Sequence, residues 1–306
     1  MLSSQSDLEE LRRRLDAIDD RLQDLLIERL EIVSRVAAEK RGGSIPVHVP
    51  AREAQMIRRL VARQEGAFPT GPLIRIWREL LGATTRAQGP FAVGVCVPQE
   101  SPGIWDIARD HYGSYAAMTV YQTTLQVIRA VTDRRITVGV LPMPQDGDSD
   151  PWWVHLLSPE ADNTPRVIAR LPFGPRGNAR LAGGDTLAIG YGPRQSSGND
   201  RTLLATENAV DISHGRFSTA FAALGLTCTM IVQGEQRNTL IEIDGFIALA
   251  DPRLRQVQER LGDDLHRVLM VGSYALPLPE AAAQPQASGL TSPSLAAAGG
   301  YGVARG

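Results

Sequence analysis

The sequence of 306 residues predicts a multidomain protein in three folded parts: three α-helices, then an α/β region, then an α+β domain of ferredoxin-like type. Three observations support this prediction. Apolar residues recur every three to four positions in the first ninety residues, short β-branched runs then alternate with helical segments, and the last third follows the order β-α-β-β-α-β. Hydrophobic residues make up 43% of the chain, which is enough to fill a core in each part.

The first helix is predicted over residues 6–40, because no Gly or Pro interrupts the chain before Gly42. Its apolar residues form a heptad-like seam: Leu8, Leu11, Leu15, Ile18, Leu22 and Leu25. At about 1.5 Å per residue this helix is about 50 Å long. A helix of that length cannot bury its seam alone, so we expect it to pack against other helices and against a second chain.

Two shorter helices are predicted over residues 51–64 and 73–87, separated by a loop rich in Gly and Pro. The apolar residues of the second of these predict its inward face: Leu73, Ile76, Trp77, Leu80 and Leu81. Together the three helices form a predicted first domain at residues 1–89.

The pattern changes at Gly89, where the predicted α/β region of residues 90–200 begins. Strands are predicted at FAVGVCVP, ITVGVLPMP, VIARLPF and TLAIGYG, and YQTTLQVIRAV reads as a helix between the first two. Residues 201–279 follow the ferredoxin-like order. Residues 280–306 are rich in Ala, Gly, Pro and Ser, and we expect them to be disordered.

Charged residues on the first helix indicate an anion site. Arg29 and Lys40 are 11 positions apart, which places them within about 20° of one face and about 16 Å apart along the axis. Arg12 lies 17 residues before Arg29, or about 25 Å away, so it can reach the same ligand only from an antiparallel helix of a second subunit. Spacing alone leaves a second interpretation open, in which these charges form a solvated face.

The segment LRRRLDAIDDRLQDLLIERLEIVSRVAAEK resembles the first helix of the all-helical chorismate mutases. Further matches follow in the family's order and spacing: Pro46, Val47, Arg52, Glu53, Thr84 and Gln88. The resemblance implies an intertwined homodimer that rearranges chorismate to prephenate in phenylalanine and tyrosine biosynthesis, with active sites shared between the two chains. It also implies that the reaction needs no metal and no cofactor.

The resemblance further implies a role for each matching residue. Three arginines would hold the two carboxylates of the substrate: Arg29, Arg52 and, from the partner, Arg12. Lys40 and Gln88 would donate hydrogen bonds to the ether oxygen whose bond to carbon breaks. Glu53 would accept from the ring hydroxyl, and Thr84 would support a carboxylate. Val49 stands where many relatives carry an acid.

Residues 91–275 resemble the prephenate dehydratase region that follows the mutase in some bifunctional proteins. The catalytic Thr-Arg-Phe triplet of that family is absent, and the nearest counterpart is Asp185-Thr186-Leu187-Ala188. Residues 201–275 resemble an ACT-type regulatory domain that lacks the usual effector signatures. An amino-acid effector, a scaffold for oligomerisation and docking of another shikimate-pathway enzyme are therefore equally compatible with the sequence.

A chorismate mutase with a regulatory or structural C-terminal region is the resulting prediction. The alternatives are a bifunctional mutase–dehydratase, a non-catalytic scaffold that uses the helices only to dimerise, and the related enzyme that removes pyruvate from isochorismate. A net charge of -2 gives no general attraction for nucleic acid. No run reaches the roughly 18 apolar residues of a membrane span, and the polar N-terminus lacks a secretory signal, so we predict a cytoplasmic protein.

Overall fold

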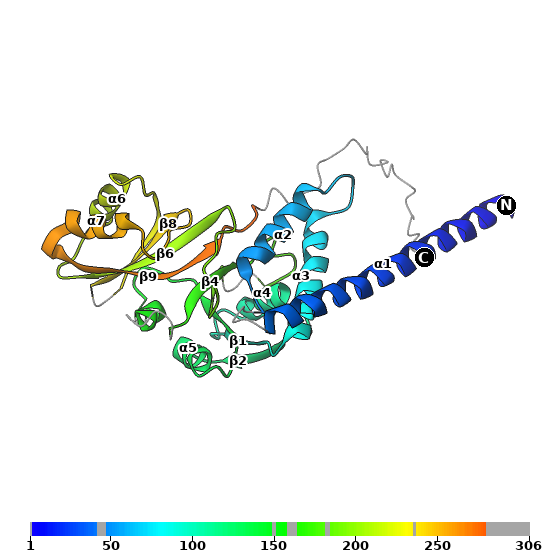
Figure 1. Cartoon of the computed structure of the whole chain (residues 1–306), viewed down its shortest axis with the longest axis horizontal. Coiled ribbons are helices and arrows are strands. Elements are labelled where there is room, and N and C mark those ends of the chain that lie inside the picture. Colours follow the sequence, from blue (N-terminus) through cyan, green and yellow to red (C-terminus); the bar gives the residue numbers. More distant parts are fainter. Residues whose placement is uncertain are drawn as a thin grey trace, which may run out of the picture.

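The computed structural model describes residues 2–41, 47–148, 151–157, 164–180, 184–234 and 237–279, apart from the side chains of residues 2–4, 40 and 41. The tail predicted at 280–306 lies outside the described residues. Figure 1 shows one long helix that projects from a body built of helices and a sheet. None of the described helices combines the length and the apolar character that crossing a membrane requires.

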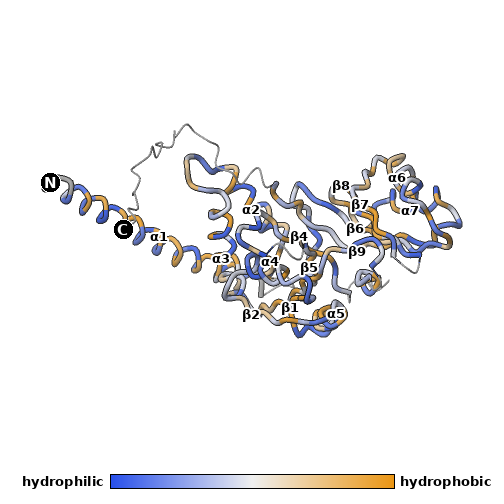
Figure 2. The backbone as a smooth tube through the Cα atoms, turned by 180° about the vertical axis from the view of Figure 1, so that it is seen from behind, coloured by the Kyte–Doolittle hydropathy of each residue, from blue (hydrophilic) through white to orange (hydrophobic). Residues whose placement is uncertain are grey.

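Helix α1 (Leu2–Arg41) confirms the predicted first helix and is unbroken, since its interior contains neither Gly nor Pro. Most of it extends away from the body, and apolar and polar residues alternate along its length (Figure 2). Its seam is exposed in the single chain: Leu15 is 59% and Leu22 54% accessible. Ala37, near the C-terminal end, is buried, because that end packs against α3.

Helices α2 (Pro50–Ala62) and α3 (Thr70–Gln88) pack against each other and confirm the second and third predicted helices. The fully buried residues of α3 are Thr70, Ile74, Arg78 and Thr85, while Trp77 and Leu81 of the predicted apolar set are partly buried against the core that contains Ile74. Ile76 of that set is 49% exposed. The buried face of α3 differs because α3 packs against α4 on the side of Gly82. The approach there is close, since a Cβ on Gly82 would lie 2.2 Å from the carbonyl oxygen of Tyr112.

The body contains one nine-stranded sheet of order β2-β1-β3-β5-β4-β9-β6-β8-β7. Its first half has two parallel connections through helices, which run β1-α4-β2-α5-β3. The elements of this half are β1 (Ala92–Cys96), α4 (Gly103–Tyr112), β2 (Ala117–Tyr121), α5 (Thr124–Thr132), β3 (Val138–Pro142), β4 (Arg166–Leu171) and β5 (Thr186–Gly190). A short 3-10 helix, η1 (Trp152–Leu156), lies between β3 and β4.

Helices α4 and α5 cover opposite faces of this half of the sheet. Alternate strand residues therefore pack in two different cores. Ile104 and Ile107 of α4 join a core with Val93 and Val138. The residues on the α5 side include Val127, Val131, Leu141, Leu187 and Ile189. The predicted alternation of strands and helices is confirmed, while α4, β2 and η1 had no counterpart in the sequence prediction.

The second half of the sheet confirms the predicted β-α-β-β-α-β order, with strands arranged β9-β6-β8-β7 and both helices packed on one face. Its elements are β6 (Asp200–Asn208), α6 (His214–Ala222), β7 (Cys228–Gln233), β8 (Asn238–Asp244), α7 (Pro252–Leu261) and β9 (Leu265–Ala275), with the 3-10 helix η3 (Gly262–Asp264) after α7. Strand β9 also pairs with β4 at Val167–Gly272, which makes the two halves one continuous sheet. A Cβ on Gly272 would lie 2.2 Å from the Val167 carbonyl oxygen, so this junction requires glycine.

Candidate active site

Three of the predicted site residues come together where α1 crosses α3. Arg29 of α1 donates a long hydrogen bond of 3.4 Å from Nη1 to Oγ1 of Thr84. Its guanidinium also lies 5.8 Å from the centroid of the Trp77 ring. Gln88 donates from Nε2 to the Thr84 carbonyl at 3.1 Å. Trp77, Thr84 and Gln88 are separated by seven and four residues, so they share one face of α3.

The charge of Arg29 is not balanced by a carboxylate among the residues that the structure describes. Burial lowers the pKa of Arg29, yet a guanidinium remains protonated at neutral pH. A half-buried cation with spare N–H donors next to a hydroxyl is suited to binding an anionic oxygen. The α1–α3 crossing can therefore hold a carboxylate.

Two further predicted residues lie elsewhere on α1. Lys40 is helical, but its side chain lies outside the described residues. Arg12 is 60% exposed and pairs with Glu9 at 2.9 Å, on the part of α1 that projects from the body (Figure 1). Arg12 is therefore not part of a pocket built by one chain, and its predicted role depends on a second copy.

The remaining two predicted residues are neighbours on α2 with different surroundings. Arg52 is exposed. Glu53 accepts a hydrogen bond at Oε2 from Nη1 of Arg78, at 3.0 Å, and its Oε1 lies 3.6 Å from Nε2 of His48. The sequence analysis did not predict Arg78 or His48 as partners of Glu53. The sequence contained one signal for Arg78: it lies four positions after Ile74, on the same face of α3, and that face is buried in the fold.

The segment that carries this geometry matches a known family. Residues 11–89 match the family model described as chorismate mutase type II. Residues 11–89 are a chorismate mutase type II domain. The match begins within α1 and ends just after α3, so it contains every predicted site residue.

Relatives of the mutase domain occur in longer proteins. A bifunctional chorismate mutase/prephenate dehydratase of Aquifex aeolicus is 28% identical over 141 residues, which is 45% of this chain and 39% of the relative. The protein of the same name from Pseudomonas aeruginosa is 27% identical over 147 residues, or 46% of this chain and 40% of the relative. The chain thus spans about two fifths of the length of these relatives.

The likeness continues beyond the mutase domain, because the aligned stretch of 141 residues is longer than the segment 11–89. The part of the chain after the mutase domain is a prephenate dehydratase-like region. A solved prephenate dehydratase from Streptococcus mutans has a TM-score of 0.42 and 13% identity, with 61% of this chain and 99% of that chain covered.

A buried polar cluster joins the mutase domain to the dehydratase-like region. The mutase domain contributes His48, Glu53 and Arg78, and α4 contributes His111 and Tyr112. Burial lowers the pKa of His48, and burial followed by the charge of Arg78 lowers the pKa of His111 well below its usual range. Burial raises the pKa of Tyr112. Both imidazoles and the phenol are therefore neutral near pH 7, beside the charged Glu53–Arg78 pair.

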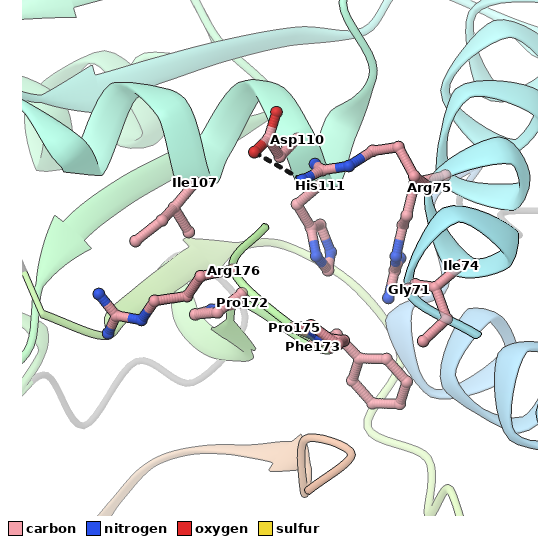
Figure 3. Close-up of a pocket in the computed structure, with 12 residues that line it drawn as sticks. Gly71, Ile74, Arg75, Ile107, Asp110, His111, Pro172, Phe173, Pro175 and Arg176 are labelled. Atoms are coloured by element: carbon pink, nitrogen blue, oxygen red, sulfur yellow. Dashed lines mark hydrogen bonds and ion pairs between the residues drawn. The ribbon is translucent and has the colours of Figure 1, made fainter. Parts of the chain in front are cut away.

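A pocket of about 390 Å³, including space open to solvent, lies beside this cluster between α3, α4 and the segment after β4 (Figure 3). Arg75 of α3 reaches Asp110 of α4 with Nη2 at 2.7 Å from Oδ2. Arg176 donates to Asp185 at 2.6 Å, and Arg78 is paired with Glu53. Since each arginine that lines this pocket has a carboxylate partner, we interpret the pocket as a junction between domains.

The segment predicted as the nearest counterpart of the dehydratase triplet lies at the start of β5. Thr186 is fully buried and its hydroxyl has no hydrogen-bond partner among the described residues, while Leu187 and Ala188 fill the two cores on either side of the sheet. Asp185 accepts from Arg170 of the neighbouring strand at 2.8 Å. The guanidinium of Arg170 therefore lies near this segment, but it is already paired with Asp185.

Proposed function

We propose that this protein is a cytoplasmic chorismate mutase that rearranges chorismate to prephenate for phenylalanine and tyrosine synthesis, and that it acts as a homodimer. One observation carries the proposal. Within a segment that belongs to the type II family, the guanidinium of Arg29 donates to the hydroxyl of Thr84, one helical turn before Gln88, and lacks a carboxylate partner among the described residues.

The reaction itself explains why cations and amides suffice. The rearrangement is concerted and intramolecular: one C–O bond breaks while one C–C bond forms, so it needs no nucleophile. The barrier falls when the enolpyruvyl arm is held over the ring. Arg29, Arg52 and the partner's Arg12 would achieve this by binding the two carboxylates bidentately, with support from Thr84.

Negative charge that develops on the ether oxygen in the transition state is stabilised by hydrogen-bond donors held in fixed positions. Lys40 and Gln88 would supply an ammonium and an amide there. Glu53 would accept from the ring hydroxyl. Its carboxylate already binds Arg78, but an ionised carboxylate offers about four acceptor positions, which leaves capacity for the substrate.

The exposed seam of α1 supports the homodimer. The seam and neighbouring apolar residues of α1 are at least 41% accessible in one chain: Leu8, Leu11, Leu15, Ile18, Leu22, Leu25, Leu26, Ile27, Leu30, Ile32 and Val36. Complete burial of an exposed Leu or Ile contributes roughly 1.5–3 kcal/mol, so each of these half-exposed side chains would contribute about half of that against a second copy. An antiparallel arrangement of two α1 helices would also bring the partner's Arg12 toward Arg29.

The test is an assay of chorismate consumption by the full chain, with the product identified by mass spectrometry. We expect prephenate. No consumption of chorismate, or release of pyruvate from isochorismate in place of prephenate formation, would refute the proposal.

A second candidate function is a combined mutase and dehydratase activity. The observation in its favour is that the aligned stretch with bifunctional relatives extends past the mutase domain. Against it, the nearest counterpart of the triplet in the sequence has Leu187 and Ala188 in place of the Arg and Phe, and both are buried in the core. Phenylpyruvate formed by the full chain at neutral pH from added prephenate would establish this second activity.

The ferredoxin-like domain is proposed to be of ACT type and to serve either an amino-acid effector or docking of another shikimate-pathway enzyme. Its strand order β9-β6-β8-β7 with two helices on one face supports the first part of this proposal. Mutase turnover measured with added phenylalanine, tyrosine or tryptophan tests the effector role. An unchanged rate with all three would contradict it.

A further inference from the structure

A second pocket differs from the pocket at the domain junction because its arginines have no acidic partners among the described residues. It lies where the start of α2, strand β4, the segment after β5 and the end of β9 meet. Its cavity volume is about 30 Å³, and the adjoining space, which is open to solvent, brings the total to about 470 Å³. Its lining includes two arginines, Arg166 and Arg194, and no Asp or Glu among the described residues.

Backbone carbonyls fix both guanidinium groups in place. Arg166, on β4, donates from Nη1 to the carbonyl of Met270 on β9. Arg194 donates from Nη2 to the carbonyl of Ile247 at 2.7 Å, and its guanidinium lies 5.6 Å from the Phe246 ring centroid. Each guanidinium carries five N–H donors, so most of them remain available.

One of the remaining donors is already removed from water. Nε of Arg194 is buried and has no hydrogen-bond partner among the described residues. A buried donor without an acceptor costs about 1–3 kcal/mol, so a ligand oxygen at this position would recover that cost.

The local charge is strongly positive. Burial lowers the pKa of both arginines, and the charge of Arg166 lowers the pKa of Arg194 further. Arg134 adds a third guanidinium, 3.2 Å from the ring centroid of Tyr191, which also lines the pocket. In the part of the chain that the structure describes, neither Arg166 nor Arg194 forms an ion pair with a carboxylate. Like charges held together in this way attract a counter-anion.

We propose that Arg166 and Arg194 form a binding site for a small organic carboxylate, separate from the mutase site. The two planar forks match the two oxygens of a carboxylate. The rest of the wall is largely apolar or aromatic: Pro50, Val167, Ile168, Tyr191 and Pro193. Such a wall favours a ligand with an apolar body over a bare inorganic ion.

Isothermal titration calorimetry of sodium benzoate binding to the full chain, at low ionic strength, tests this site. We expect saturable binding by the wild type, with an affinity at least about tenfold weaker in Arg166→Gln and in Arg194→Gln, since each loses charge-assisted hydrogen bonds. Arg253→Gln is the matched control, because Arg253 already pairs with Asp251 at 2.7 Å. This control should bind benzoate like the wild type, and sodium chloride at equal ionic strength should give no saturable heat.

Arg194→Lys extends the test to a variant that keeps the positive charge but loses the planar guanidinium, which can bind both oxygens of a carboxylate. We expect it to bind several-fold more weakly than wild type. Circular dichroism confirms that each variant is folded. The proposal is overturned if benzoate does not bind, if both Gln variants bind it unchanged, or if only inorganic phosphate or sulfate binds at these arginines. Because the readout is binding, the outcome is independent of mutase turnover.

Discussion

Arg29 and Glu53 were both predicted to contact substrate, yet their surroundings differ. Arg29 donates to the hydroxyl of Thr84, whereas Glu53 is paired with the buried Arg78. Removing one member of a buried ion pair leaves the other uncompensated, at a cost of about 3–5 kcal/mol. A substitution at Glu53 therefore changes stability and turnover together, and Lys40 is the cleaner probe of catalysis.

Replacing Lys40 with Ala should lower the kcat of chorismate rearrangement by about 10²–10³-fold, because it removes one donor to the developing oxyanion. The helical circular dichroism signal should be unchanged, since alanine favours helix. Arg14→Ala, an exposed charge on the same helix, should retain wild-type turnover. Near-normal turnover in Lys40→Ala would refute the assigned role.

The buried imidazoles predict a pH dependence of stability. His48 and His111 have pKa values lowered by burial, so below about pH 6.5 the unfolded chain binds protons that the folded chain excludes. Their contribution to stability is present above the unfolded pKa and is lost as the pH falls toward the folded values. We expect the free energy of unfolding, measured by urea titration, to decrease from about pH 7 to about pH 5.5. In the double variant His48→Gln/His111→Gln this decrease should be smaller than in the wild type. An equal decrease in the two proteins would contradict the explanation.

At the scale of single elements, α1 is the helix whose apolar residues are most exposed in the single chain. Its C-terminal end packs on α3, while the seam along the projecting part is exposed. Most helix stability in proteins comes from tertiary packing, so the projecting part needs a second surface. The heptad-like spacing of that seam matches a helix–helix interface.

Leu22→Asp should convert the dimer to a monomer, because it places a charge in the middle of the proposed helix–helix interface. Light scattering coupled to size exclusion measures the mass. Turnover should fall with the dimer fraction, since the partner's Arg12 is then lost from the site. Arg21→Ala, one residue away and exposed, should stay dimeric. A fully active monomer would exclude the shared site.

At the scale of the whole molecule, β9 links parts that the sequence presents as separate domains. It pairs with β6 along most of its length and with β4 at Gly272. The hairpin α2–α3 also shares a core with Phe173 and Ala275 from the rest of the chain. The three predicted domains are therefore packed together, and we expect them to unfold cooperatively.

Gly272→Ala should destabilise this link by about 3 kcal/mol, because the added Cβ would collide with the backbone of Val167. Hydrogen exchange should show loss of protection in β4 and β9 together. Gly215→Ala in α6 is the control, since a Cβ there meets nothing within 4 Å. It should be neutral or stabilising by up to about 1 kcal/mol. Equal stability of the two variants would contradict the close approach.

Local patterns in the chain were sufficient for the order of the elements, for the family of the first domain and for the residues around Arg29. Three- and four-residue spacing and the matching motif are both properties of contiguous sequence. The elements that escaped prediction lack such a pattern: β2 is a largely exposed edge strand, and the buried face of α4 includes the polar residues Asp106 and His111.

Long-range packing decided what those patterns could not. Arg78 became the partner of Glu53, β9 joined two domains, and Arg166 came to lie beside Arg194, because the fold brings together segments that are distant in the chain. Which face of α3 is buried depended on α4, and no periodicity within α3 contains that information. A buried charge finds its partner through the tertiary fold, whereas a helix is recognisable from its own residues.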